Sequence, residues 1–204
     1  MMEAEDDSVP VALLAGTSLT AGLGLSPSDA FPAVLQRMAD SAGVPVRVEN
    51  RGLSGETSAG LVRRLPWLLS HGADVVMIET GANDGLRGLH VDSTRANLVR
   101  AVEVVREIRP GAQVLLVQME APPNLGERYT AAFRAMFGEV AEETGARLVP
   151  FLLEGVAGEA GMNQADGMHP NERGAARVAE TVWPVFVDAV RVVGRMVAED
   201  GRNR

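Results

Sequence analysis

The feature that most constrains the fold is an unbroken apolar run at residues 11–15, which ends abruptly in Gly16. A continuous apolar run is typical of a strand buried on both faces of a parallel sheet, whereas a half-exposed strand alternates apolar and polar residues. Gly16 allows a sharp turn after the strand, and two small hydroxyl residues, Thr17 and Ser18, follow it. Ligands of open parallel sheets bind beyond the carboxyl ends of the strands. The run therefore predicts an α/β fold and places Ser18 where chemistry would occur.

Four more apolar segments have the length of strands, and helical patterns separate them. The predicted strands after the first are 44–48, 75–78, 114–117 and 147–151. The predicted helices are about 26–43, 59–71, 93–108, 128–144 and 172–196, with a kink or break expected at Pro66. This alternation predicts a three-layer α/β/α sandwich around a central, mostly parallel five-stranded sheet. We expect one domain over residues 1–204, with flexible tails at 1–8 and 198–204.

The charged residues and the histidines limit the possible partners and cofactors. The chain has 19 arginines, no lysine and 27 acidic residues, and its net charge of -8 argues against a nucleic-acid partner or an anionic membrane. The absence of lysine excludes a Walker-type phosphate loop, a Schiff-base lysine and a Ser-Lys dyad. Cysteine is also absent and the three histidines are dispersed, so we expect no metal site. We take His71 and His90 as surface or loop residues.

No stretch reaches the ~18 apolar residues that a membrane span needs, so we expect no stable membrane insertion. Residues 1–7 are acidic and lack the basic region of a secretory signal, which predicts a cytoplasmic protein as the chain is written. A periplasmic or secreted protein whose leader has been removed would have the same sequence, and this alternative stays open.

Four predicted loops carry groups that could act together in acyl transfer. Ser18 supplies a hydroxyl, Gly55 an unshielded backbone N–H and Asn83 a side-chain amide. Asp166 and His169 form an Asp-x-x-His pair directly before a proline that can open a helix. A carboxylate three residues before a histidine in a turn can accept the ring Nδ1–H, which leaves Nε2 free to act as a base. An amide and one or two backbone N–H groups can stabilise a developing oxyanion.

Each of these residues also has an ordinary structural explanation. Ser18 could be a helix N-cap or a turn serine. Asp166 could cap the last helix, with His169 as a loop residue. Asn83 could serve only as a turn former and Gly55 only for backbone geometry.

Taken together, the four loops resemble the conserved blocks of the SGNH/GDSL hydrolase family, and most closely its bacterial branch of thioesterase I/protease I/lysophospholipase L1-like arylesterases. The similarity covers residues from about 9 to 186. The blocks read Gly-Thr-Ser-Leu-Thr-Ala-Gly at 16–22, Asn-Arg-Gly-Leu-Ser-Gly-Glu-Thr-Ser at 50–58, Gly-Ala-Asn-Asp-Gly-Leu-Arg-Gly at 81–88 and Asp-Gly-Met-His-Pro at 166–170. Four blocks in the family's order and approximate spacing are far more specific than any one of them.

The resemblance implies an SGNH-hydrolase fold, which is flavodoxin-like, and a serine esterase that forms an acyl-enzyme. It places the nucleophile on Ser18 and the acid and base on Asp166 and His169. It places the oxyanion-hole donors on Ser18, Gly55 and Asn83. It requires neither a metal nor an organic cofactor. The expected partner is a small-molecule ester or thioester, and we expect a monomer or a weak homo-oligomer.

Substrate preference is only partly implied. Aryl esters and esters with short to medium acyl chains are expected, and thioesters and lysophospholipids are included in the range. Because loops at strand ends would line the acyl side of the site, the predicted substrate contacts are Leu86, Arg87, Leu89, Pro122 and Pro123. The leucines suit a modest apolar acyl group, whereas Arg87 could meet a charged substrate or remain solvated.

Thr17 departs from the family pattern, which usually has aspartate directly before the serine. That aspartate is not one of the catalytic residues, so we expect altered loop stability or activity rather than loss of the mechanism. Three alternatives stay open. The first is a carbohydrate O-acetyl esterase, which would need polar and aromatic residues that stack on sugars. The second is a catalytically impaired SGNH-like module that binds a small ligand, and the third is a flavodoxin-like binding module.

Overall fold

The computed structural model describes residues 9–202, and its centre is a five-stranded parallel sheet. The strands are β1 (Val11–Gly16), β2 (Arg47–Gly52), β3 (Val75–Ile78), β4 (Gln113–Val117) and β5 (Arg147–Val149). Their order is β2-β1-β3-β4-β5, and every neighbouring pair is parallel. This is the flavodoxin-like order, in which ligands bind where the strand order reverses. Here that point lies at the carboxyl ends of β1 and β3.

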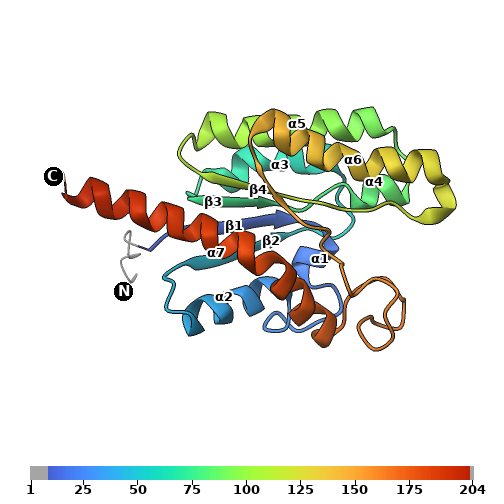
Figure 1. Cartoon of the computed structure of the whole chain (residues 1–204), viewed down its shortest axis with the longest axis horizontal. Helices are drawn as coiled ribbons and strands as arrows, with labels where there is room; N and C mark the ends of the chain where they lie inside the picture. The colour runs from blue at the N-terminus through green and yellow to red at the C-terminus, as the bar shows by residue number, and fades with distance from the viewer. Residues whose placement is uncertain (1–8, 203–204) are drawn as a thin grey trace.

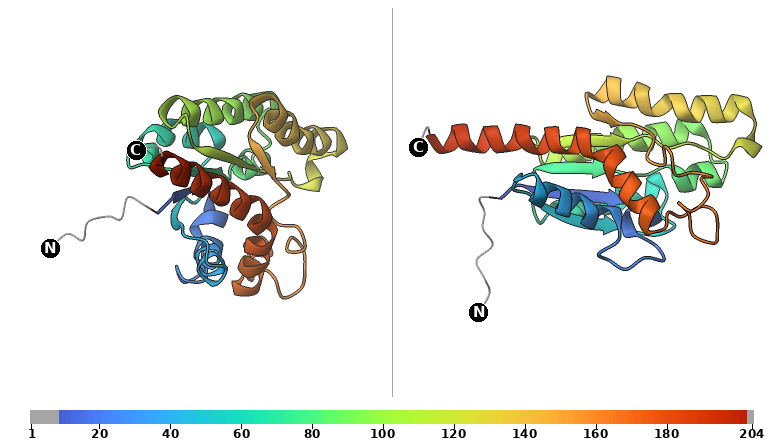
Figure 2. Two further views of the ribbon diagram at one scale, coloured as in Figure 1. Left: turned by 60° about the vertical axis from the view of Figure 1, so that its left-hand side comes forward. Right: turned by 60° about the horizontal axis from the view of Figure 1, so that its bottom comes forward.

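Helices cover both faces of the sheet (Figure 1), so the predicted α/β/α sandwich is confirmed. One face is covered by α2 (Phe31–Ser41) and α7 (Glu172–Arg202), which pack against each other. The other is covered by α3 (Ser58–Leu69), α5 (Val91–Ile108) and α6 (Glu127–Thr144), with α5 between α3 and α6. Figure 2 shows the same layers from two further sides, with the C-terminal part of α7 extending past the sheet. Leu13, Leu14, Met77 and Ile78 are fully buried between the layers, as their continuous apolar runs predict.

The second strand was predicted wrongly, at 44–48 rather than at Arg47–Gly52. Val44 and Val46 are buried, but they pack into the core from the connection before the strand. The strand itself is polar because it lies at the edge of the sheet and pairs with β1 alone. The side-chain amide of Gln36 bonds to the Val46 carbonyl at 2.9 Å and to the Val48 N–H at 2.8 Å, so it covers the start of this edge.

Short helical segments occupy three loops that were predicted without helix. They are α1 (Ser18–Ala21), α4 (Ala82–Leu86) and the 3₁₀ turn η1 (Pro123–Leu125). Pro66 does not break α3, which continues to Leu69. Residues on both sides of Pro66, Leu65 and Leu68, are buried in the core, and this packing holds the helix across the missing N–H.

The last helix continues to Arg202, beyond the predicted end at residue 196, so residues 198–202 of the predicted tail are helical. The tail predicted at 1–8 and residues 203–204 lie outside the described residues. Within residues 9–202, none of the helices is long and apolar enough to span a bilayer.

Candidate active site

Ser18 lies where β1 ends and the chain turns directly into α1. Its side chain is half-buried, and its Oγ lies 3.0 Å from Nε2 of His169, although the two residues are 151 positions apart in the chain. The N-cap of α1 is Thr17 rather than Ser18. The Ser18 hydroxyl therefore has a partner on a distant loop instead of a capping contact.

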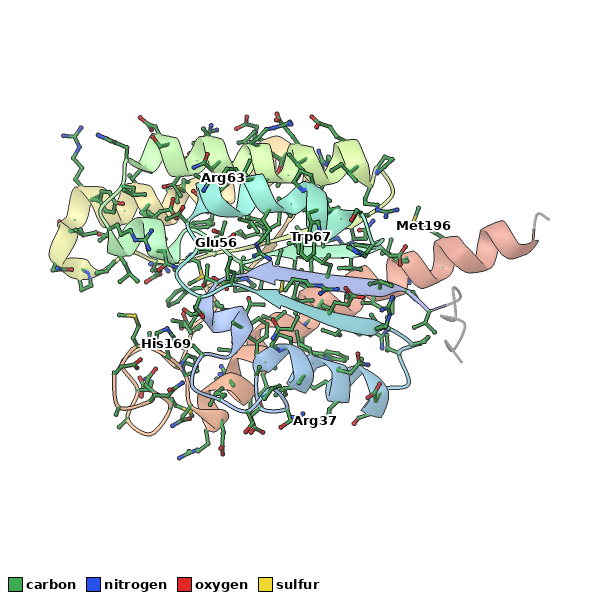
Figure 3. All side chains as sticks on the ribbon, turned by 180° about the vertical axis from the view of Figure 1, so that it is seen from behind. Arg37, Glu56, Arg63, Trp67, His169 and Met196 are labelled. Carbon is green, nitrogen blue, oxygen red and sulfur yellow. The ribbon has the colours of Figure 1, made fainter. Side chains whose placement is uncertain are left out.

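Asp166 holds His169 from the other side of the ring. The distance from Nδ1 of His169 to Oδ2 of Asp166 is 2.6 Å, and Oδ1 of the same carboxylate accepts the backbone N–H groups of Met168 and His169 at 2.9 and 3.0 Å. The hydrogen bond to the His169 ring, followed by the two backbone bonds, lowers the pKa of Asp166 from 3.8 to about 2. Asp166 is thus a carboxylate at neutral and moderately acidic pH. Figure 3 shows His169 on the loop that precedes α7.

The last helix is capped by Asn171 and not by Asp166. Oδ1 of Asn171 accepts the N–H groups of Arg173 and Gly174, both at 3.0 Å, in the first turn of α7. The Nδ2 group of Asn171 donates to two backbone carbonyls of the preceding loop. Asn171 therefore ties the loop that carries Asp166 to the start of α7.

Asn83 lies in α4, which follows β3, and Gly55 lies in the loop that follows β2. The Asn83 Nδ2 group donates to the Glu56 carbonyl at 3.0 Å, which orients the amide and leaves one N–H for a ligand. Gly55 has φ +79°, a conformation that a side chain would strain. Among the described residues, neither the Ser18 N–H nor the Gly55 N–H donates to a protein acceptor. Three donors are thus free beside the Ser18 hydroxyl.

Asp84 fixes the loop that carries Asn83. Its buried carboxylate accepts the Ser58 N–H at 2.8 Å, the Ser58 Oγ–H at 2.5 Å and the Thr94 Oγ1–H at 3.4 Å. These bonds join α4 to the first turns of α3 and α5. Because Gly55 lies three residues before Ser58, the same bonds keep Asn83 and Gly55 close to one another.

A second buried carboxylate, Glu79, lies at the end of β3 behind α1. It has no exposed surface and accepts hydrogen bonds only from Thr17 and Thr20 among the described residues. Burial raises the pKa of Glu79, and the hydrogen bonds from the two threonines oppose this effect. Neither the role of Glu79 nor that of Asp84 was predicted from the sequence. The sequence does contain one signal for Glu79. It is an acidic residue directly after the apolar run of β3, where the end of the strand is expected to be buried.

A cavity of about 560 Å³ opens over Ser18. Its lining combines the polar groups above with a mainly apolar wall. The apolar wall comprises Leu19, Leu23, Ala82, Leu86, Met119, Ala121, Pro122, Pro123, Phe151, Leu153, Ala157 and Met168. The cavity can therefore hold an apolar group next to the serine hydroxyl.

The structure brings three of the five predicted substrate contacts to this cavity, namely Leu86, Pro122 and Pro123. Arg87 and Leu89 are not part of its lining. Arg87 Nη2 donates to the Gly55 carbonyl at 3.0 Å, so it supports the Gly55 loop. The Leu89 carbonyl accepts the hydroxyl of Tyr129 at 2.6 Å. The apolar residues from β5 onward that line the cavity were missed, since only the fold brings them to Ser18.

The other two histidines lie away from this cavity. His71 is exposed and packs edge-on against Trp67, and His90 is exposed at the start of α5. In the described part of the chain, no group of three or more His, Asp or Glu side chains is placed to hold a metal ion.

Comparison with known proteins matches residues 14–177 to the GDSL-like lipase/acylhydrolase family. The chain is 44% identical over 175 residues to esterase TesA of Pseudomonas aeruginosa, which covers 85% of this chain and 86% of that protein. It is 37% identical over 169 residues to thioesterase 1/protease 1/lysophospholipase L1 of Escherichia coli, covering 82% of this chain and 79% of that protein. The crystal structure of the psychrotrophic esterase EstA from Pseudoalteromonas sp., inhibited by monoethylphosphonate, superimposes with a TM-score of 0.81 at 32% identity, covering 89% of this chain and 96% of that one.

Proposed function

This chain belongs to the GDSL-like lipase/acylhydrolase family and is a carboxylic ester hydrolase, and we propose that it acts through Ser18, His169 and Asp166 by way of an acyl-enzyme. The observation that carries this proposal is the chain of short contacts from Ser18 Oγ through the His169 ring to Asp166, at the floor of the apolar cavity. Ser18 is the nucleophile, His169 the general base, and Asp166 the group that orients the ring.

In the first step, His169 Nε2 takes the proton from Ser18 while Oγ forms a bond to the carbonyl carbon of the ester. Asp166 accepts the Nδ1–H of the ring, which sets the tautomer that leaves Nε2 unprotonated, and it stabilises the imidazolium that forms. Since the pKa of Asp166 is about 2, the carboxylate keeps this role at neutral and moderately acidic pH. Nε2 must be unprotonated to accept the serine proton.

The negative charge that develops on the carbonyl oxygen is stabilised by the N–H groups of Ser18 and Gly55 and by the amide of Asn83. Their position at the end of the sheet supports this role. The hydrogen bonds from Asn83 to the Glu56 carbonyl and from Arg87 to the Gly55 carbonyl also support it, because they hold these donors in place. Donors that are held in place before the reaction cost no reorganisation in the transition state. Each such donor is worth about 3 kcal/mol in other oxyanion holes.

The tetrahedral intermediate collapses when the bond to the leaving group breaks and His169 protonates that group. The product alcohol, phenol or thiol then departs and leaves an ester on Ser18. Water attacks this ester with His169 again as base, and Ser18 regains its proton. All proton transfers use one histidine.

The lining of the cavity supports esters with apolar acyl or aryl groups, and thioesters of similar shape. A carbohydrate substrate is less well supported, because Phe151 is the one aromatic ring besides His169 among the residues that line the described cavity. Impaired catalysis is also less well supported. Thr17 donates its hydroxyl to Glu79 and leaves the contact between Ser18 and His169 in place.

Hydrolysis of a p-nitrophenyl ester series from acetate to decanoate tests the proposal, with the Ser18→Ala variant measured in parallel. We expect turnover by the wild type and a loss of several orders of magnitude in kcat for Ser18→Ala, with an unchanged melting temperature. Arg128→Ala, on the exposed face of α6, serves as a matched control and should retain activity. Equal rates for the wild type and Ser18→Ala would refute the assignment of the nucleophile.

A further inference from the structure

Glu79 is a fully buried carboxylate without a positively charged partner among its hydrogen-bonded neighbours. A charged group in such a place is costly unless its hydrogen-bonding capacity is filled. It is not needed to join β3 to the sheet, because β3 pairs with β1 and β4 through backbone bonds. The presence of an acid here therefore calls for an explanation.

In the described part of the chain, every hydrogen bond of the Glu79 side chain comes from Thr17 or Thr20, the two residues that flank Ser18 and Leu19. Oε2 accepts the Thr17 N–H at 2.8 Å, the Thr20 hydroxyl at 2.8 Å and the Thr20 N–H at 3.4 Å. The Thr17 hydroxyl donates to Oε1 at 2.9 Å. Its partners are two backbone N–H groups, which can only donate, and two hydroxyls, which donate to it here. One side chain thus holds both ends of the turn that presents the serine.

Glu79 also performs the capping of α1. The N-cap residue, Thr17, makes no side-chain capping bond, since its hydroxyl points to Glu79. The N–H of Thr20, in the first turn, is accepted by Glu79 instead. Packing leaves little freedom for this arrangement, because a Cβ at Gly16 would lie 2.0 Å from the Thr20 hydroxyl oxygen and 2.6 Å from Oε2 of Glu79.

We propose that Glu79 is the positioning residue for the nucleophile: through Thr17 and Thr20 it fixes the Ser18 hydroxyl toward His169 and the Ser18 N–H toward the substrate oxygen. This inference rests on the role proposed for Ser18 and adds a group that touches neither substrate nor the reacting atoms. It also explains how the turn keeps its shape with threonine at position 17. The hydroxyl and N–H of Thr17 both donate to Glu79, so the turn needs no second carboxylate.

The test compares Glu79→Gln with Asp74→Asn, a matched control at the other end of the same strand. Asp74 precedes β3 and accepts the Val11 N–H at 2.8 Å, so it also binds a backbone donor of β1 but lies far from Ser18. The amide of glutamine cannot accept at both positions, which leaves donors of Thr17 or Thr20 unpaired. We expect Glu79→Gln to lower kcat on p-nitrophenyl butyrate about 100-fold with KM nearly unchanged, since a small misplacement of a reacting group has an effect of this size. Asp74→Asn should lower the melting temperature and keep kcat.

If Glu79→Gln does not fold, two variants of Thr20 test the proposal instead. Thr20→Val removes one hydroxyl donor at constant shape and should lower kcat about tenfold. Thr20→Ser keeps the hydroxyl and should fall much less. The proposal is overturned if folded Glu79→Gln keeps the wild-type kcat, if Asp74→Asn loses kcat equally, or if Thr20→Val and Thr20→Ser behave alike. If the wild-type protein hydrolyses no ester, the role of Ser18 is overturned as well. If the wild type is active and Ser18→Ala is inactive, the role of Ser18 stands, and the variants of Glu79 and Thr20 test the role of Glu79 alone.

Discussion

The exposed carboxylate of Asp166 accepts three hydrogen bonds, and these bonds lower its pKa. Its pKa in the folded protein, about 2, lies below the ordinary value of 3.8. The bonds of the ionised form therefore favour the folded state above pH 3.8, and this contribution is lost as the pH falls through 2. Asp166 therefore remains ionised, and able to orient the His169 ring, until the pH approaches 2.

The variant His169→Ala should raise the pKa of Asp166. The ring supplies the largest of the effects that lower this pKa, and the backbone bonds from Met168 and His169 remain. We expect a value above 2 that stays below 3.8. Titration of the carboxyl carbon of Asp166 by NMR measures it in both proteins. An unchanged pKa would mean that the ring of His169 does not bind Asp166 in solution.

Among the helices and strands, those with side chains buried in the core were predicted most accurately from the sequence. The strands β1, β3 and β4 were predicted to within one residue, because their apolar runs fill the middle layer. The strand β2 was misplaced because an edge strand carries polar residues, and the buried Val44 and Val46 precede it. The helices α1 and α4 are too short for a periodic pattern, and the first turn of α1 is capped by Glu79, a group from a distant segment.

Two glycines of α6 give opposite predictions for stability. A Cβ at Gly138, inside the helix, would meet no atom within 4 Å, so Gly138→Ala should raise the free energy of unfolding by about 1 kcal/mol through helix propensity. Gly145 caps the same helix with φ +65°. Gly145→Ala should lower the free energy of unfolding by about 1 kcal/mol, because a left-handed conformation strains alanine. Urea denaturation of both variants measures the difference. A gain at Gly145 or a loss at Gly138 would contradict this account of α6.

At the scale of the whole molecule, the active site exists only because the fold brings together loops from both ends of the chain. Composition excluded several classes of site, and the spacing of Asp166 and His169 predicted their contact, since a three-residue turn is local. The 3.0 Å approach of His169 to Ser18 spans 151 residues. The joint occurrence of the four loops and the resemblance to a family indicated that the two residues act together, whereas no local spacing predicted the contact. Arg87 and Leu89 were predicted as substrate contacts from their loop, but the direction of a side chain on a loop depends on its neighbours, here Gly55 and Tyr129.

Covalent trapping identifies the nucleophile of the reaction. An alkylphosphonate p-nitrophenyl ester is mixed with the protein, release of p-nitrophenol is followed, and the modified peptide is identified by mass spectrometry. A bond from Ser18 Oγ to phosphorus should form as the bond to p-nitrophenolate breaks, with the serine proton taken by His169. We expect one release per chain, the label on Ser18, and far slower labelling of His169→Ala. A label on another residue, or none in a protein that hydrolyses esters, would contradict Ser18 as the nucleophile.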